Sequence, residues 1–273
     1  MNRKPLGVLA VLILLSLTQL LLLTPDAKSK QYYSSLQCPL VIAHQRGDGV
    51  WPGDTLYAFE KAVAIGADVL EMDAHITKDG QIVLMHNETV DGTRDGTGLI
   101  EELTMADLQE LDAAYKWSND ADKTFPYRGQ EIRVPTLEEL FQQFPQMRYV
   151  IEIKLTQNPI DKPLCDLIRK HNMQAKVMVA SFHDEAMQSF RETCPEIATS
   201  ASRGEVTKFV LLGKVFLSGL VAPQYQSIQP PYDPAESQNI PILTKRFIRE
   251  AHAKNLKVEP WTVDDPELMK QYI

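Results

Sequence analysis

The amino-acid sequence predicts an α/β fold, most simply a TIM-type (β/α)8 barrel. Short apolar runs rich in Val, Ile and Leu alternate with amphipathic helical patterns along its 273 residues. Apolar runs of this kind are typical of strands buried on both faces, and their alternation with helices indicates a parallel sheet covered by helices. The chain is also long enough to bury one large core.

Several expected helices are bounded by residues that favour a helix end. An apolar stripe over 55–65 stops at Gly66, and Pro135 stands directly before the helix expected at 136–144. The other helices are expected at 101–112, 160–171, 184–192 and 244–254.

The expected strands are the apolar runs that lie between these helices. They cover residues 40–43, 68–70, 82–85, 149–154, 177–182 and 256–263. Asp79 and Gly80 predict a tight turn before the third run. The chain ends at Ile273, partway through the helix that opens at Asp264, and no later run could pair with the first strand. We therefore expect a barrel that lacks its last strand.

Residues 1–24 differ in kind from the rest of the chain. A Leu-rich run at 6–23 follows Arg3 and Lys4, and it is long enough to span the ~30 Å hydrocarbon core of a bilayer. Basic residues before such a run place the N-terminus in the cytoplasm. The sequence therefore predicts a transmembrane signal-anchor helix.

The predicted anchor is followed by a polar linker at 25–37 and a domain at 38–273. This domain is expected to face the periplasm or the cell exterior. The alternative is secretion after cleavage of a signal peptide, for which residues 24–28 offer only a weak cleavage site.

Charge and cysteine content narrow the classes of function. The net charge is -8 and no basic stripe stands out, which argues against a nucleic-acid partner. The three cysteines, Cys38, Cys165 and Cys194, have no metal-ligand spacing and could form at most one disulfide. We expect them to be buried thiols.

Carboxylates in the predicted strands are the clearest candidates for chemistry. Glu71 and Asp73 are two residues apart, so their side chains share one face of a strand, and Glu152 occupies a similar run. Acids buried on one face are costly without a compensating charge, and a hard cation such as Mg²⁺ or Ca²⁺ binds carboxylate oxygens. The alternative is that the pair lies in solvent at a strand end.

Two histidines and a lysine occur at the ends of the same runs. His44 and His86 each follow an apolar run, and such a pair can donate a proton to a leaving alkoxide and take one from water. Lys154 follows Glu152 by two residues, and it could hold a phosphate or form an ion pair within the strand. The other histidines are expected to be structural or exposed, although His75 continues the same-face series of acids.

Short motifs along the chain occur in an order known from one enzyme family. They are Ile42-Ala43-His44, Thr55-Leu56-Tyr57-Ala58-Phe59, Glu71-Met72-Asp73, Thr77-Lys78-Asp79-Gly80, Val83-Leu84-Met85-His86, Asp95-Gly96-Thr97-Gly98, Ile151-Glu152-Ile153-Lys154 and Trp261-Thr262-Val263-Asp264-Asp265-Pro266. The ordered set resembles the glycerophosphodiester phosphodiesterase family over about 40–273. The resemblance implies a (β/α)8 barrel related to phosphatidylinositol-specific phospholipase C.

The resemblance also implies a reaction in lipid and glycerol metabolism. A glycerophosphodiester would be hydrolysed to sn-glycerol 3-phosphate and an alcohol, by attack of the glycerol 2-hydroxyl on phosphorus and opening of the cyclic phosphate by water. The implied roles are metal ligands for Glu71, Asp73 and Glu152, general acid and base for His44 and His86, and substrate binding for Lys154, Gln45 and Trp261. A small insertion near 88–133 would cover the active-site rim.

The chain departs from the family pattern at particular positions. Gln45 stands where the family usually has Arg, so it can donate hydrogen bonds but carries no charge. Asn87 replaces the common Asp after His86, and the family's last strand is absent after Ile273. Two alternatives stay open: a lysophospholipase D that acts on lipid-tailed substrates, and a truncated, catalytically weak domain.

Overall fold

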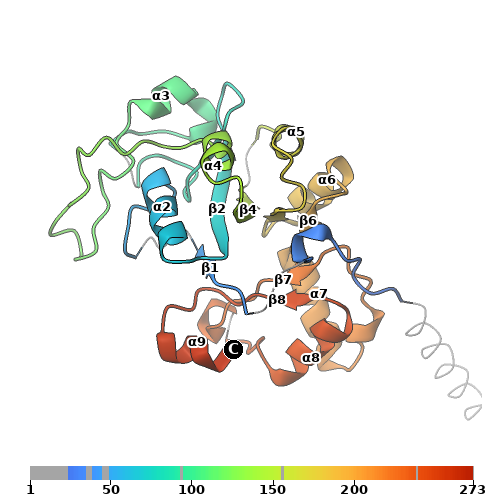
Figure 1. The fold of residues 1–273 in the computed structure, drawn as a ribbon. Coiled ribbons are helices and arrows are strands. Elements are labelled where there is room, and N and C mark those ends of the chain that lie inside the picture. Colours follow the sequence, from blue (N-terminus) through green and yellow to red (C-terminus); the bar gives the residue numbers. More distant parts are fainter. Residues whose placement is uncertain are drawn as a thin grey trace, which may run out of the picture. The chain divides into compact units, whose positions relative to one another are not determined.

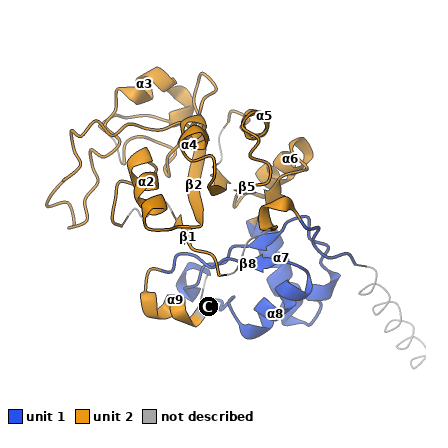
Figure 2. Ribbon diagram, viewed as in Figure 1, with its two compact units in different colours: residues 1–29, 203–263 blue, residues 30–202, 264–273 orange. Residues whose placement is uncertain are grey.

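The computed structural model describes residues 24–34, 39–44, 49–92, 95–154, 157–237 and 239–272, which belong to two compact units (Figure 2). Unit 1 comprises the segment that ends at Ser29 together with Arg203–Val263. Unit 2 comprises Lys30–Ser202 together with Asp264–Ile273. Both units contain parallel strands and helices, which confirms the predicted α/β class.

Unit 2 is built on a sheet of parallel strands that follow chain order. These strands are β1 (Ile42–Ala43), β2 (Val69–Ile76), β4 (Arg148–Ile153), β5 (Val177–Ala180) and β6 (Ala198–Thr199). Each strand pairs in parallel with the next (Figure 1). Parallel neighbours need a long connection, which explains why helical segments separate these strands in the sequence.

Strand β3 (Ile82–Leu84) differs from the prediction. The run at 82–85 is expected among the strands of a parallel sheet, but β3 pairs antiparallel with β2. The connection is too short for a parallel crossover, and the Thr77 N–H closes it by donating to the Gln81 carbonyl at 2.9 Å. Gly80 adopts a φ of +82° in this turn, a conformation that favours glycine. The predicted turn is therefore confirmed, while the strand direction is wrong.

The helices of unit 2 follow the sequence prediction with one exception. They are α2 (Leu56–Ala64), α3 (Met105–Gln109), α4 (Leu137–Gln143), α5 (Asp161–Lys170), α6 (Asp184–Thr193) and α9 (Pro266–Tyr272), with 3-10 turns η1 (Gln31–Tyr33) and η3 (Ile100–Glu102). The single helix expected at 101–112 is wrong. The Thr104 side chain accepts the Asp107 N–H and caps α3 as a separate helix after η3.

The two faces of the unit 2 sheet have different chemical character. The helix-covered face contributes Leu70, Met72, Ala74, Tyr149, Ile151 and Val179 to the main apolar core. The opposite face carries an apolar layer of Val69, Val150, Met178 and Ala198 around Tyr32 of η1. Because side chains alternate along a strand, Glu71, Asp73 and Glu152 share this opposite face.

Unit 1 is smaller and contains the second parallel strand pair. Its elements are α7 (Arg203–Lys214), η4 (Ser218–Leu220), β7 (Ser227–Ile228), η5 (Pro234–Ser237), α8 (Lys245–Ala253) and β8 (Lys257–Val258). Strands β7 and β8 pair in parallel. The strand expected at 256–263 is shorter than predicted, since Pro260 has no N–H to continue the ladder. Helix α7 and strands β6 and β7 were not predicted from the sequence.

The first described residues bond to the C-terminal part of unit 1. Ala27 is buried, its N–H donates to the Lys254 carbonyl at 3.0 Å, and Asn255 Nδ2 donates to the Ala27 carbonyl at 2.9 Å. These bonds hold part of the segment that was expected to be a polar linker.

The predicted anchor at 1–24 lies outside the described residues except for Thr24. Among the helices that the structure does describe, none has the length and apolar character needed to cross a bilayer. The expected absence of a closing strand stays a prediction.

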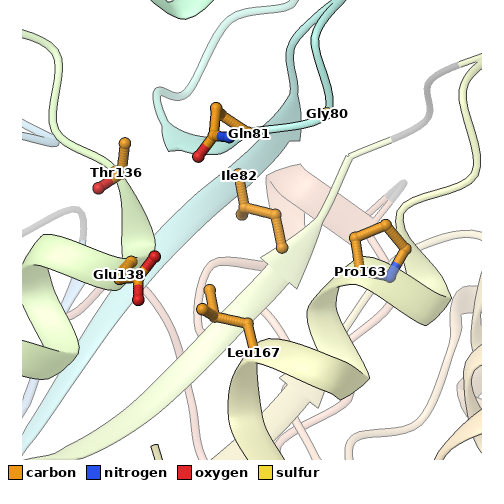
Figure 3. A pocket seen from close by; sticks show the side chains of 7 residues that line it. All are labelled: Gly80, Gln81, Ile82, Thr136, Glu138, Pro163 and Leu167. Carbon is orange, nitrogen blue, oxygen red and sulfur yellow. The ribbon is translucent and has the colours of Figure 1, made fainter. Parts of the chain in front are cut away.

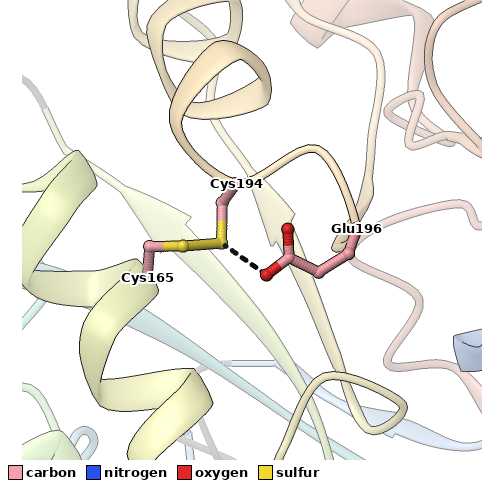
Figure 4. Close-up of side chains that lie close together, drawn as sticks. All are labelled: Cys165, Cys194 and Glu196. Atoms are coloured by element: carbon pink, nitrogen blue, oxygen red, sulfur yellow. Dashed lines mark hydrogen bonds between the residues drawn. A yellow bond between two sulfur atoms is a disulfide. The ribbon is translucent and has the colours of Figure 1, made fainter.

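A disulfide joins two helical segments of unit 2 (Figure 4). Cys165 lies on α5, Cys194 directly follows α6, and their Cα atoms are 5.8 Å apart. The expectation of buried thiols is therefore wrong for these two residues, because the packing of α5 against α6 brings together cysteines that are distant in sequence. Cys38 lies outside the described residues.

Thr136→Ala is expected to lower the free energy of unfolding by about 1 kcal/mol, because it removes the cap of α4. The Thr136 hydroxyl accepts the Glu139 N–H at 3.1 Å, and the Glu139 carboxylate accepts the Thr136 N–H at 2.7 Å. Urea unfolding followed by circular dichroism measures the change. Glu139→Gln is the control and should lose less, because glutamine keeps the acceptor. An equal loss in the two variants would contradict the capping explanation.

Candidate active site

Parallel pairing brings the predicted acids together. Asp73 on β2 is the strand partner of Glu152 on β4, and Glu71 lies two residues before Asp73 on the same face. One oxygen atom of each carboxylate lies within 4.8 Å of the other two. Glu71 and Asp73 are 7 % and 1 % exposed, so these acids do not lie in solvent at a strand end. We call these three residues the carboxylate centre.

Lys154 joins two members of the carboxylate centre. Its Nζ lies 2.7 Å from Glu152 Oε1 and 2.9 Å from Asp73 Oδ1. Burial alone would lower the pKa of Lys154, but the charges of Asp73 and Glu152 raise it above its ordinary value. Burial also raises the pKa of Glu152, against the opposing effect of Lys154. The lysine is therefore charged, and the ion pair considered at the sequence level is formed.

The composition of the carboxylate centre fits a divalent cation. The three acids outnumber the single ammonium group of Lys154, so the group contains more acidic than basic side chains. Asp73 Oδ2 is buried and has no hydrogen-bond partner within the described part of the chain. A buried carboxylate oxygen without a partner is unfavourable unless a cation binds it. The donors are all oxygen atoms, the ligand type that Mg²⁺ and Ca²⁺ prefer.

A second group of potential metal ligands, formed by Cys165, Cys194 and Glu196, does not fit a cation. Cys165 and Cys194 lie close to Glu196, but their sulfur atoms are bonded to each other and provide no thiolate (Figure 4). The contact of 3.8 Å between Cys194 Sγ and Glu196 Oε1 contains no S–H donor. Glu196 instead accepts a hydrogen bond from Arg169 Nε at 2.7 Å.

His86 reaches the carboxylate centre through the β2–β3 hairpin. The Met85 N–H donates to the Asp73 carbonyl at 3.0 Å, which holds the chain next to β2 just before His86. The exposed imidazole has its Nδ1 at 3.1 Å from Asn87 Oδ1. Because an amide oxygen can only accept, Nδ1 carries the hydrogen of this contact.

His44 directly follows β1. The last residue of β1, Ala43, pairs in parallel with Leu70, the residue before Glu71 on the neighbouring strand. The side chain is half-buried. The two predicted acid–base histidines thus follow β1 and β3, which both pair with the edge of β2 that is opposite β4.

Two predicted substrate-binding residues cannot be placed at this centre. Gln45 lies outside the described residues. Trp261 belongs to unit 1, where its Nε1 donates to the Gln229 carbonyl at 2.7 Å and its backbone forms a bridge with Pro231. Their roles stay predictions.

Two supporting residues were not recognised as such from the sequence. Asn87 counted only as a departure from the family's Asp, yet its amide oxygen provides the acceptor that orients His86. Buried Ser181 donates to the Ile153 carbonyl at 2.8 Å and so fixes the backbone between Glu152 and Lys154. Asn87 could have been recognised from the sequence, because a side chain with an acceptor oxygen directly follows His86. Ser181 could not, because its contact with Ile153 depends on the pairing of β4 with β5.

A pocket elsewhere in unit 2 does not coincide with the carboxylate centre (Figure 3). Its lining residues are Gly80, Gln81, Ile82, Thr136, Glu138, Pro163 and Leu167. The acid among them, Glu138, accepts from Lys170 Nζ at 2.6 Å and lies 2.9 Å from His171 Nε2. These contacts give Glu138 a structural role.

Residues 44–273 match the model of the glycerophosphoryl diester phosphodiesterase family. A glycerophosphodiester phosphodiesterase of Caldanaerobacter subterraneus subsp. tengcongensis is 29% identical over 239 residues, which cover 86% of this chain and 89% of that protein. A lysophospholipase D of Homo sapiens is 29% identical over 184 residues, which cover 66% of this chain and 56% of that protein.

A solved structure shares the architecture. It is a phosphodiesterase of Oleispira antarctica in complex with the product sn-glycerol-3-phosphate, and it aligns with a TM-score of 0.64 at 25% identity. The alignment covers 88% of this chain and 91% of that structure. The likeness supports a TIM-barrel-like α/β fold.

Proposed function

This chain belongs to the glycerophosphoryl diester phosphodiesterase family, and we propose that it hydrolyses glycerophosphodiesters to sn-glycerol 3-phosphate and an alcohol. The observation that carries the proposal is the convergence of Lys154 with Glu71, Asp73 and Glu152 on one face of the sheet. Such a group of charges suits a phosphate ester, because it combines a cation-binding cluster with a lysine that can bind an anion.

The carboxylate centre is proposed to hold one divalent cation, Mg²⁺ or Ca²⁺. Glu71, Asp73 and Glu152 would provide its ligands, and Asp73 Oδ2 is the oxygen that lacks another partner in the described part of the chain. When bound, the cation would stabilise negative charge that develops on the phosphoryl oxygens. Lys154 would stay charged next to it and bind the phosphate through Nζ.

His44 and His86 are proposed to act as general acid and general base. With Nδ1 bonded to Asn87, the His86 Nε2 atom of the neutral ring would take the proton of the attacking glycerol 2-hydroxyl as the new P–O bond forms. His44 would give a proton to the alcohol oxygen as its bond to phosphorus breaks. The two histidines would exchange roles when water opens the cyclic phosphate.

The predicted location is proposed together with this activity. Residues 1–24 would anchor the chain in a membrane, and the domain at 38–273 would lie on the extracytoplasmic side. The Cys165–Cys194 disulfide supports this side, because disulfides form and persist in oxidising compartments and are rare in the cytosol.

The proposal is tested by incubating the purified, EDTA-treated protein with glycerophosphocholine, with and without Mg²⁺ or Ca²⁺. We expect sn-glycerol 3-phosphate and choline in equal amounts, only with added metal. No turnover with either ion over a panel of glycerophosphodiesters would refute the proposed function.

A lysophospholipase D activity is the second candidate. The human relative of that name supports it, although this chain spans little more than half of that protein's length. Lysophosphatidylcholine in the same panel separates the two candidates: release of choline from this lipid alone would favour the second.

A further inference from the structure

Three large hydrophobic side chains are exposed at the C-terminal end of helix α7 in unit 1. Leu211, Val215 and Phe216 are 57 %, 60 % and 77 % exposed. They are three of the eight exposed large hydrophobic side chains in the described part of the chain, and they lie within six consecutive residues. Single exposed apolar side chains are common on proteins, whereas a group of neighbouring ones marks an interaction site. We call these three residues the apolar tip.

Phe216 occupies a backbone position that favours glycine. The Phe216 N–H donates to the Gly213 carbonyl at 3.1 Å, and the Leu217 N–H donates to the Leu212 carbonyl at 2.8 Å. These two bonds form a Schellman motif at the end of α7, in which Phe216 adopts the left-handed conformation with a φ of +65°. Glycine is the usual residue there because it has no Cβ. Neither the backbone nor burial therefore accounts for a phenylalanine, and a binding role would explain it.

Helix α8 supports the apolar tip within unit 1 (Figure 2). The Arg246 guanidinium carbon lies 3.7 Å from the centroid of the Phe216 ring, and Arg246 Nη2 donates to the Gly213 carbonyl. Deeper in the unit, the Phe209 and Phe247 rings pack edge to face with their centroids 5.7 Å apart. These contacts fix the position of the tip, although most of the Phe216 side chain stays in solvent.

Basic residues border the apolar tip. Lys208 and Lys214 are exposed, and each lies three residues from Leu211, which makes them its neighbours on the helix surface. The segment Arg203–Val263 contains eight lysines and arginines and five acids, although the whole chain has a net charge of -8. Such a combination suits a bilayer with anionic lipids, because lysines are attracted to lipid phosphates and apolar side chains enter the layer below the head groups.

The residues that follow the predicted anchor are attached to the same helix as the tip. The Thr24 carbonyl accepts a hydrogen bond from Lys254 Nζ at 3.3 Å, and the Ala27 N–H donates to the Lys254 carbonyl at 3.0 Å. Lys254 caps the C-terminal end of α8 and Arg246 lies near its start, so the two attachment points are separated by about 12 Å along the helix. An anchor at 1–24 would therefore lead directly onto unit 1 and bring the tip close to the bilayer surface.

We propose that the apolar tip, together with Lys208 and Lys214, docks on the surface of an anionic phospholipid bilayer. Leu211, Val215 and Phe216 would enter the apolar layer, and the two lysines would contact lipid phosphates. The inference rests on the membrane anchor of the proposed function to bring unit 1 to the bilayer. It adds a second, separate contact that holds unit 1 there.

A fluorescent label at the tip measures docking in the full chain. Val215→Cys is combined with Cys38→Ser, because the other two cysteines form the disulfide, and the labelled protein is placed in nanodiscs with a single copy per disc. The discs contain phosphatidylcholine and phosphatidylglycerol, and part of the lipid carries a nitroxide quencher on its acyl chains. We expect the label to be quenched in these discs, and much less so in discs of phosphatidylcholine alone or at high salt.

Phe216→Gly in the labelled protein separates docking from a structural role of the ring. We expect the ratio of quenched to unquenched label to fall roughly 10- to 100-fold, because burial of a phenylalanine side chain has an effect of this size. The Tm should stay equal or rise, because glycine adopts the left-handed conformation without strain. Ile65→Ser is the matched control: it removes an apolar side chain of unit 2 that is 73 % exposed, and it should leave the ratio unchanged.

The outcomes separate this inference from the proposed function. Absence of turnover would refute the function, and a chain that does not enter the discs would refute the anchor; vesicles of the same lipids, added to that chain, would then decide the docking. A label that stays unquenched in anionic lipid would overturn the inference. Quenching only where several copies share a vesicle would also overturn it, in favour of a contact between two copies of this chain. A lower Tm with unchanged quenching in Phe216→Gly would assign the ring a structural role instead.

Discussion

Asp73→Asn is expected to abolish divalent-metal binding and hydrolysis while the metal-free protein stays at least as stable as the wild type. The substitution keeps the shape of the side chain but removes one of the three clustered carboxylates, and one of the two that contact Lys154. Without a bound cation, the remaining carboxylates repel one another less, and this smaller repulsion favours the folded state. With a cation, the oxygen that lacks another partner in the described part of the chain is lost as a charged ligand.

We expect kcat/KM to fall by about 10³-fold or more, as when electrostatic stabilisation of a transition state is removed. Titration calorimetry with Mg²⁺ and Ca²⁺ should show no binding heat, and Tm in EDTA should be equal to or above that of the wild type. Asp166→Asn is the matched control, because it removes an acid from an exposed surface pair with Lys162. A metal-binding Asp73→Asn protein, or one with a sharply lower Tm in EDTA, would contradict the assignment of this centre.

Removal of the Cys165–Cys194 disulfide is expected to lower the free energy of unfolding by about 3–4 kcal/mol without a large change in kcat. The bond closes a loop over a sequence separation of 29, and the estimate follows from the restriction it places on the unfolded chain. The disulfide joins helical segments of unit 2 and includes none of the carboxylates, so the effect should fall on stability.

Urea unfolding with and without a reductant measures this contribution. The control is the double variant Cys165→Ala with Cys194→Ala, which should have the lower stability and no response to the reductant. Thiol alkylation followed by mass spectrometry on the untreated protein gives an independent check. Two alkylated cysteines at these positions before reduction would show that the bond does not form.

The centre could be predicted from the sequence to the extent that it depends on local periodicity. Glu71 and Asp73 share a face because they are two residues apart in a strand, and that inference needs no tertiary structure. The meeting of Asp73 with Glu152 depends on a parallel register between strands more than 70 residues apart in the chain. Only the family resemblance indicated that pairing.

The features that could not be predicted depend on packing. The run at 82–85 is apolar on both sides, and periodicity cannot tell a parallel from an antiparallel neighbour. The disulfide follows from the contact of α5 with α6, which no cysteine spacing encodes. Residues 203–214 have a weak apolar stripe and two glycines, so helix α7 lacked a usable signal.

The β2–β3 hairpin gives the centre an order of assembly. Asp73 and His86 are joined by a short turn, so this half can form early from local contacts. Glu152 and Lys154 arrive only when β4 pairs with β2 across a long loop, a step with a larger entropic cost. The proposed metal binding would require both halves. Uptake of the ion during refolding should therefore follow the slow, non-local step, and a bound cation should stabilise the paired strands.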